Sequence, residues 1–398
     1  MKSGWQAKTL GEVCRIKPPK NEARGRVSAD GLVSFLPMED LGINQKFVRA
    51  RQAKPLSTVV GSYTYFAEGD VLLAKITPCF ENGKLGIAEG LANGVGFGSS
   101  EYIVFRPDGT LSKEWLYYYL SREAFRVEGA ARMAGAVGHK RVAKEFIESY
   151  PIPVPPLPEQ QRIVGILDEA FDGIATAGAN AEKNLQNARA LFESHLQSIF
   201  AQRGEGWIEK KLGEVAEVQS GGTPSVSKKE YWGGEIPWYS SGELNNTFTK
   251  APERKVTEAG LRNSNAKLFP KGSLLVGMYD TAALKMSVLD RDGAFNQAVA
   301  GVKPNDSVDV EFVLNAINAS KPRLLRERRG VRQKNLSLGK IREIAIPLPV
   351  VTEQRATVSR LRRVLAETER LESHYQRKLA ALEALKKSLL HQAFSGDL

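Results

Sequence analysis

The chain has 398 residues, a formal net charge of +11 and a pI near 9.4, and at about 150 residues per domain its length predicts two or three domains. Its two cysteines, Cys14 and Cys79, stand far apart without a CxxC pattern, which argues against a disulfide scaffold or a zinc ribbon. We find no secretory signal and no apolar run of about 18 residues, so we expect a cytoplasmic protein that has no membrane partner.

The chain carries an internal repeat. The segment Leu10–Val13 recurs as Leu212–Val215, 202 residues later. The end of each half matches at an offset of 194, since Ile152–Pro155 followed by Glu159-Gln160 corresponds to Ile346–Pro349 followed by Glu353-Gln354. That offset continues without a gap to the pair Phe200 and Phe394, over roughly fifty residues. A register held over this length indicates a real duplication.

In each half, the first part reads as a mixed globule. Residues 1–150 and 204–345 hold short β-branched runs and turn signals, and Glu101–Phe105 alternates as a strand does. The stretch Glu114–Phe125 is helical in pattern. Gly94–Gly98 has glycine spacing, but no apolar strand precedes it and no helix follows, so we predict a loop rather than a cofactor site.

The second part of each half reads as a long helix. Residues 159–202 and 353–395 place apolar side chains at steps of three or four, which keeps them on one face. Each helix would span about 60 Å, too long for burial inside a 150-residue globule, so we expect the two helices to pair. Thr352 is the predicted N-cap of the second helix.

These elements predict an α+β protein with a pseudo-two-fold internal repeat. Two similar mixed α/β globules, residues 1–150 and 204–345, would be joined by two long antiparallel helices that form a coiled-coil spacer. The helical segments are residues 151–203 and 346–398.

The positive charge is concentrated in the globules. Residues 1–150 hold 21 Lys and Arg against 16 Asp and Glu, and residues 204–345 hold 22 against 17, a net +5 each. A membrane-surface protein would place its basic residues on amphipathic helices instead. Two matched basic globules therefore favour a nucleic-acid reader with two contact points.

Catalytic signatures are missing from the sequence. No Walker A phosphate loop occurs, because Gly83-Lys84 is followed by Leu85 and Gly339-Lys340 by Ile341. The four histidines are scattered, so we expect no metal site and no cofactor in this chain. Two alternatives stay open: a DNA methyltransferase or nuclease with an unrecognised active site, and a helical scaffold whose globules bind protein.

Several motifs together carry a family resemblance. Pro153–Asp168, with the distal copy around Pro347–Gln354 and the closing Leu389–Gly396, resembles the central and distal conserved regions of DNA-specificity subunits of Type I restriction-modification systems. Ser220–Ser225 and Ile236–Leu244 are similar to one target-recognition domain type of that family, and Leu36–Leu41 with Thr77–Lys84 to another. The distal copy departs from the central one in having Val351-Thr352 where the central copy has Leu157-Pro158.

The resemblance implies a non-catalytic DNA-recognition subunit. Each globule would be a target-recognition domain reading one half of an asymmetric, bipartite site in double-stranded DNA, and the helices would fix the unread spacer. Family members dock two methyltransferase subunits, largely through the helices, and recruit translocating nuclease (restriction) subunits. S-adenosylmethionine, ATP and Mg²⁺ would then belong to those partners.

Candidate contact residues follow from side-chain chemistry, because bases are read by Arg, Lys, Asn, Gln, Ser and Thr and phosphates are bound by Lys and Arg. The candidate DNA contacts are Lys75, Asn82, Lys84, His139, Lys140 and Arg141 in the first globule, and Thr223, Ser225, Lys228, Lys229, Ser240, Lys285, Arg328, Arg329, Arg332 and Lys334 in the second. The candidate partner contacts on the helices are Glu159, Gln160, Ile163, Leu167, Leu185, Glu353, Gln354, Leu361 and Leu379.

Overall fold

The computed structural model describes residues 4–136, 138–279, 282–329 and 336–398, with the backbone alone for 327–329. The chain divides into two compact units, which share two long helices. Unit 1 comprises residues 1–181 and 377–398, and unit 2 comprises residues 182–376. We call residues 4–156 head 1 and residues 203–350 head 2, which are the parts of the two units outside the long helices.

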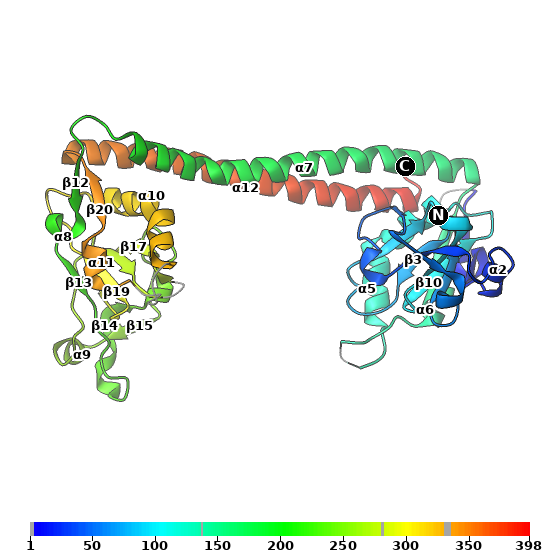
Figure 1. Cartoon of the computed structure of the whole chain (residues 1–398), viewed down its shortest axis with the longest axis horizontal. Coiled ribbons are helices and arrows are strands. Elements are labelled where there is room, and N and C mark those ends of the chain that lie inside the picture. Colours follow the sequence, from blue (N-terminus) through cyan, green and yellow to red (C-terminus); the bar gives the residue numbers. More distant parts are fainter. Residues whose placement is uncertain (1–3, 137, 280–281, 330–335) are drawn as a thin grey trace. The chain divides into compact units, whose positions relative to one another are not determined.

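The two long helices are α7 (Leu157–Gln202) and α12 (Val351–Ser395), drawn without a break in Figure 1. They confirm the helices predicted from apolar spacing. The prediction that Thr352 caps the second helix is wrong, because α12 begins at Val351 and Thr352 lies within its first turn. No helix among the described residues is long and apolar enough to cross a membrane.

Head 1 contains two small sheets and a two-stranded ribbon. The sheets have the strand orders β2-β10-β7-β8-β4 and β5-β3-β9-β6, and β1 pairs with β11 in the ribbon. The strands are β1 (Gln6–Thr9), β2 (Cys14–Ile16), β3 (Leu32–Leu36), β4 (Phe47–Val48), β5 (Gln52–Pro55), β6 (Thr64–Ala67), β7 (Val71–Ala74), β8 (Leu85–Ala88), β9 (Val95–Gly98), β10 (Tyr102–Pro107) and β11 (Pro151–Val154). The helices are α1 (Leu10–Val13), α2 (Asn21–Arg24), α3 (Leu56–Val59), α4 (Lys113–Ser121), α5 (Glu123–Ala131) and α6 (Lys144–Ser149), with the 3₁₀ turns η1 (Met38–Asp40) and η2 (Ala92–Gly94).

The prediction of a loop at Gly94–Gly98 is wrong. Residues 95–98 form the buried strand β9, which runs parallel to β3 and antiparallel to β6. A Cβ added at Gly96 would lie 2.2 Å from the ring of Phe66, and one at Gly98 would lie 2.3 Å from the carbonyl oxygen of Leu36. These glycines therefore allow close packing inside a sheet.

Helix α4 joins head 1 to the long helices. Its side chains Trp115 to Leu120 are all buried. The ring of Trp115 lies 4.5 Å from that of Phe394 on α12, and the ring of Tyr118 lies 5.4 Å from that of Phe171 on α7. Because a helix buried on every side must pack between other elements, α4 forms the layer between the sheet of β7 and β8 and the helix pair.

Head 2 repeats this plan with differences. Its sheets have the orders β13-β19-β16-β17 and β15-β14-β18, and β12 pairs with β20. The strands are β12 (Ile208–Lys211), β13 (Val218–Ser220), β14 (Trp232–Tyr239), β15 (Arg254–Val256), β16 (Leu274–Gly277), β17 (Met286–Val288), β18 (Ala294–Phe295), β19 (Val299–Val302) and β20 (Ala345–Leu348). The helices are α8 (Leu212–Val215), α9 (Glu258–Arg262), α10 (Val310–Arg329) and α11 (Leu338–Arg342), with the 3₁₀ turns η3 (Lys229–Tyr231) and η4 (Ser241–Glu243). The long α10 stands where head 1 has α4 followed by α5.

Candidate nucleic-acid interface

Two loops of head 1 lie side by side through backbone hydrogen bonds. The loop between β7 and β8 meets the segment that precedes α6: the amide of Thr77 donates to the carbonyl of Lys140 at 2.9 Å, and the amide of Val142 donates to the carbonyl of Lys75 at 3.0 Å. A β-bridge pairs Ile76 with Arg141. The candidates Lys75, Lys140 and Arg141, which are distant in sequence, are therefore brought together on one surface.

The cations on this surface are only partly neutralised. Arg141 donates two hydrogen bonds to the carboxylate of Glu101, at 2.9 and 2.8 Å, and Lys75 Nζ lies 3.9 Å from the same carboxylate. The hydrogen bonds from Arg141 hold the pKa of Glu101 below its ordinary value. The side chains of His139 and Lys140 are exposed and have no hydrogen-bond or ion-pair partner among the described residues. Lys140 is therefore the only one of these three cations, Lys75, Lys140 and Arg141, that has no carboxylate partner among the described residues.

The β7–β8 loop holds two more candidate DNA contacts, Asn82 and Lys84, of which only Asn82 is exposed. Asn82 is exposed and available. Lys84 is turned inward, where its Nζ donates to the carbonyls of Met38 and Glu39 at 2.7 and 3.4 Å. We therefore remove Lys84 from the candidate DNA contacts, because its ammonium is engaged in holding the turn η1.

Head 2 places its corresponding loops in the same way. The amide of Leu336, just before α11, donates to the carbonyl of Met278, just after β16, at 2.8 Å. This bond is the counterpart of the one between Val142 and Lys75 in head 1. Lys285 ends the loop and donates to Asn245 Oδ1 at 3.0 Å.

Four candidates of head 2 fall where the structure gives no side chains. Arg332 and Lys334 lie outside the described residues. Arg328 and Arg329 end α10, and their side chains are not described. Their predicted contacts with DNA stay predictions.

The loop between β13 and β14 carries four further candidates, all exposed: Thr223, Ser225, Lys228 and Lys229. Thr223 donates to Gln297, Ser225 lies 2.9 Å from Ser227 Oγ, and Lys228 Nζ donates to the hydroxyl of Tyr231 at 3.0 Å. These contacts orient polar side chains at the surface without burying them.

Ser240 has a local structural role. Its hydroxyl and amide both donate to the carboxylate of Glu243, at 2.8 and 2.6 Å, across the turn η4. Since this pattern satisfies the start of a helical turn, the hydroxyl is committed within the chain, and we do not retain Ser240 as a base reader.

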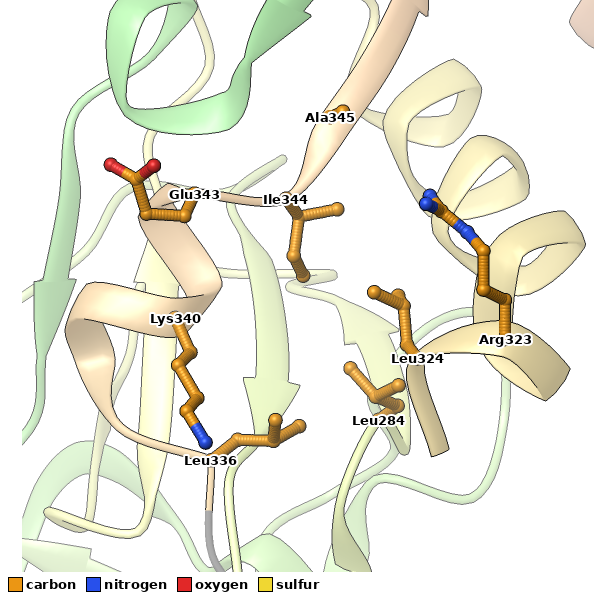
Figure 2. A pocket seen from close by; sticks show the side chains of 8 residues that line it. All are labelled: Leu284, Arg323, Leu324, Leu336, Lys340, Glu343, Ile344 and Ala345. Atoms are coloured by element: carbon orange, nitrogen blue, oxygen red, sulfur yellow. The ribbon is translucent and has the colours of Figure 1, made fainter. Parts of the chain in front are cut away.

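A cavity of about 290 Å³ opens beside these loops in head 2 (Figure 2). Its lining combines apolar side chains from three segments, among them Leu284, Leu324 and Ile344, with the ends of Lys340 and Glu343 directed apart. Arg323 also lines the cavity, but none of the candidate DNA contacts among the described residues does, so we do not include the cavity in the candidate interface.

A buried glutamine attaches each head to a long helix. Gln160, on the first turn of α7, accepts a hydrogen bond from the amide of Ser112 at 2.7 Å and donates to the carbonyls of Thr110 and Pro155 at 2.9 and 2.8 Å. Its side chain is fully buried. Ser112 in turn caps α4 by accepting from the amide of Trp115.

The same attachment recurs at the start of α12. Gln354 is fully buried, accepts from the amide of Asp309 at 2.8 Å and donates to the carbonyls of Ser307 and Pro349 at 3.2 and 2.8 Å. Asp309 caps α10 by accepting from the amide of Phe312. The duplication seen in the sequence therefore extends to individual hydrogen bonds.

Comparison with known proteins decides the family. The family model described as Type I restriction modification DNA specificity domain matches residues 2–184 and 204–381. The chain belongs to this family.

Curated members of the family match parts of the chain. The EcoEI specificity subunit of Escherichia coli is 40% identical over 163 residues, which cover 41% of this chain and 27% of that protein. The EcoR124I/EcoR124II specificity subunit of the same species is 29% identical over 242 residues, covering 55% of this chain and 57% of that protein. The match to the first of these relatives thus spans about a quarter of its length.

Two solved structures share the fold of this specificity-subunit family member over its whole length. A structure of a type I restriction-modification system matches with a TM-score of 0.80 at 19% identity, covering 100% of this chain and 99% of the other. The HsdS subunit of Thermoanaerobacter tengcongensis matches with a TM-score of 0.72 at 18% identity, covering 100% of this chain and 98% of the other. Both confirm the predicted fold class.

The helix residues predicted to contact a partner need correction. Five of them are buried within their own unit and cannot belong to a docking surface: Gln160, Ile163, Leu167, Gln354 and Leu361. Two others bond within the chain, since Glu159 pairs with Arg162 at 2.7 Å and Glu353 accepts from Trp207 Nε1 at 2.7 Å. The partner contacts were expected from the family resemblance, and the sequence does not show which face of each helix packs against the chain's own head.

Leu185 and Leu379 are half-buried on α7 and α12. Their predicted role in partner contact therefore stays a prediction.

The sequence prediction also missed cations that lie beside Lys75 and Arg141. Lys17, Lys20 and Lys144 line one cavity together with these two residues. The repeat offered a signal, because the offset of 202 places the segment Lys17–Lys20 just before the counterpart of Thr223.

Proposed function

We propose that the chain is the DNA-recognition subunit of a Type I restriction-modification complex, in which each head reads one half of an asymmetric, bipartite site. The observation that carries this proposal is the repeated loop arrangement: in each head the segment before a short helix, α6 or α11, donates a backbone hydrogen bond to the loop after a central strand, and in head 1 this segment carries Lys140 and Arg141. Membership of the specificity family supports it.

The two heads would read different half-sites. Head 1 offers Asn82 and Lys140, whereas head 2 offers Thr223, Ser225 and Lys229 in a loop of different sequence. Amide and hydroxyl groups can read base edges in the major groove, while lysines bind phosphates. Because the two heads present different polar side chains from different loops, we expect them to favour different target bases.

The helices would fix the unread spacer and dock two methyltransferase subunits, with restriction subunits recruited to the complex. The exposed apolar side chains of Ile166, Leu191 and Leu385 lie on these helices and are available for such contacts. S-adenosylmethionine, ATP and Mg²⁺ would be bound by those partners. The complex would act on DNA in the cytoplasm.

Methylome sequencing of cells that express this chain with its methyltransferase tests the proposal. The expected result is methylation at a bipartite motif that is absent when the chain is omitted. Replacing residues 1–150 by the corresponding head of another family member should change one half-site only. A swap that alters both halves contradicts the modular reading.

Two simpler assays separate the alternatives. Methylation of DNA by the pure chain with S-adenosylmethionine, without any partner, would identify an enzyme. A gel shift without any salt-sensitive DNA affinity would identify a helical scaffold whose heads bind protein.

A further inference from the structure

Head 1 contains a cavity of about 400 Å³ with an unusual lining. Five of its residues are cationic and none is acidic: Lys17, Lys20, Lys75, Arg141 and Lys144. Two of these, Lys75 and Arg141, belong to the paired loops of the candidate interface. The cavity therefore extends that interface toward the loop between β2 and α2.

The loop that contributes Lys17 and Lys20 is held firmly. Lys17 adopts a left-handed backbone conformation with φ of 56°, and its amide donates to the carbonyl of Val104 at 2.8 Å. Pro18 is buried directly after it. A non-glycine residue seldom adopts this conformation, and residues held in it cluster at binding and active sites.

Lys17 and Lys20 lack the neutralisation that the other cations have. Arg141 and Lys75 share Glu101, and Lys144 lies 3.1 Å from Glu148. Among the described residues, neither Lys17 nor Lys20 has a carboxylate partner.

Lys20 is instead held by neutral groups. Its Nζ donates to the carbonyls of Val60 and Gly61 at 3.1 and 2.9 Å. Burial lowers the pKa of Lys20, and the charges of Lys17 and Arg24 lower it further. Positive groups repel one another here, so an anion would relieve the repulsion.

The aromatic wall of the cavity gives little means of reading bases. Tyr65 and Tyr102 are buried, and their hydroxyls donate to Glu22 at 3.3 Å and to the carbonyl of Pro37 at 2.9 Å. A lining with five cations and no acidic residue attracts an anion, and lysine and arginine are the side chains that most often bind DNA phosphates, so the cavity suits a phosphate group.

We propose that this cavity holds a phosphodiester group of the DNA strand beside the half-site of head 1, with Lys17 and Lys20 as its contacts. The inference rests on the proposed DNA-recognition function and adds a positioning site to it. The two lysine contacts are specific to head 1, because the offset of 202 places uncharged Gln219 and Gly222 at the corresponding positions of head 2.

The test compares the full-length chain with the variant Lys17→Ala/Lys20→Ala, using duplexes that contain the target found by methylome sequencing. The control is Arg49→Ala/Arg51→Ala, which removes two exposed cations of head 1 that do not line the cavity. Binding is measured between 50 and 200 mM salt. The logarithm of the binding constant falls with the logarithm of the salt concentration, with a slope of about −0.9 for each phosphate contact. Over this fourfold rise in salt, each lost phosphate contact should therefore make the fall in affinity about 3.5-fold smaller.

A second arm uses duplexes with single neutral methylphosphonate linkages. A methylphosphonate at one or two linkages beside the half-site of head 1 should weaken DNA binding by the wild-type chain and leave binding by the lysine variant unchanged. The lysine variant should rank different target sequences in the same order as the wild-type chain. Loss of sequence preference in the lysine variant, or the same salt slope as wild type, overturns the inference.

A third arm titrates thymidine monophosphate into the chain. Saturable binding that depends on Lys17 and Lys20, with DNA binding untouched by their removal, would make the cavity a free-nucleotide site and overturn the inference. A wild-type chain that binds no duplex at all refutes the proposed function itself, which separates the two failures.

Discussion

Replacing Gln160 by leucine should destabilise unit 1 strongly. The substitution keeps a similar volume but leaves three backbone groups without partners, namely the amide of Ser112 and the carbonyls of Thr110 and Pro155. Each unsatisfied buried group costs about 1–3 kcal/mol. The three groups together cost about 3–9 kcal/mol, and the added apolar burial offsets roughly 1–2 kcal/mol of this, so the expected net loss is about 1–8 kcal/mol.

Hydrogen exchange followed by mass spectrometry, combined with urea unfolding, measures this loss. Peptides around Ser112 should lose protection, while those around Asp309 in unit 2 should keep it. The matched control is Gln161→Leu, which changes the exposed neighbour on the same turn and should shift stability by no more than about 0.5 kcal/mol. If Gln160→Leu behaves like this control, the buried hydrogen bonds contribute nothing net and the reasoning fails.

The variant Gln160→Glu adds a pH signature to the same test. Its carboxylate would face the carbonyl oxygens of Thr110 and Pro155, so its folded-state pKa should rise above the ordinary value of about 4.3. A raised folded-state pKa makes the protonated form the stable one. The variant should therefore be nearest to wild type in acid and lose stability as the pH rises.

Four further outcomes are expected. Gln354→Leu should weaken unit 2 and spare unit 1 in the same exchange experiment. Arg106→Leu should cost about 3–5 kcal/mol in urea unfolding, because it strips Asp70, 2% exposed, of its buried ion pair. The hydrogen bond from Arg106 lowers the pKa of Glu22 in the folded protein. This interaction should therefore stabilise the fold at pH values above the ordinary pKa of a glutamate and cease to do so as the pH falls through the lowered pKa of Glu22. Urea unfolding at pH 7 and in acid would measure the difference. Inserting four residues near Asn180 should change the spacer length in the methylome and leave both half-sites as they are.

The long helices and the repeat could be predicted because they rest on patterns that the sequence displays directly. Apolar steps of three or four located α7 and α12 to within two residues of their observed starts. Strand β9 could not be predicted in this way, since Gly96 and Gly98 indicate a turn until the ring of Phe66 is known to fill the space beside them. Glycine serves both purposes, and the local sequence does not distinguish them.

The candidate interface was predictable only as a set of residue types. Sequence placed basic residues near Lys75 and Lys140, but backbone pairing between distant loops decides which of them meet. Lys84 shows the limit, because its carbonyl partners lie more than forty residues away in the chain. Gln160 is a polar residue on a helix and was predicted to lie on the surface and contact a partner, but its side chain is fully buried.

The glutamine attachments explain how two heads of different sequence can use one kind of junction. Gln160 and Gln354 bond to backbone amides and carbonyls of their heads, at Ser112 and Thr110 in one unit and at Asp309 and Ser307 in the other. Backbone groups are present whatever the side chain is, so these bonds place few demands on the sequence of a head. A head can therefore change the loops proposed to face DNA while keeping the same attachment to its helix, provided that a helix is capped at the corresponding place.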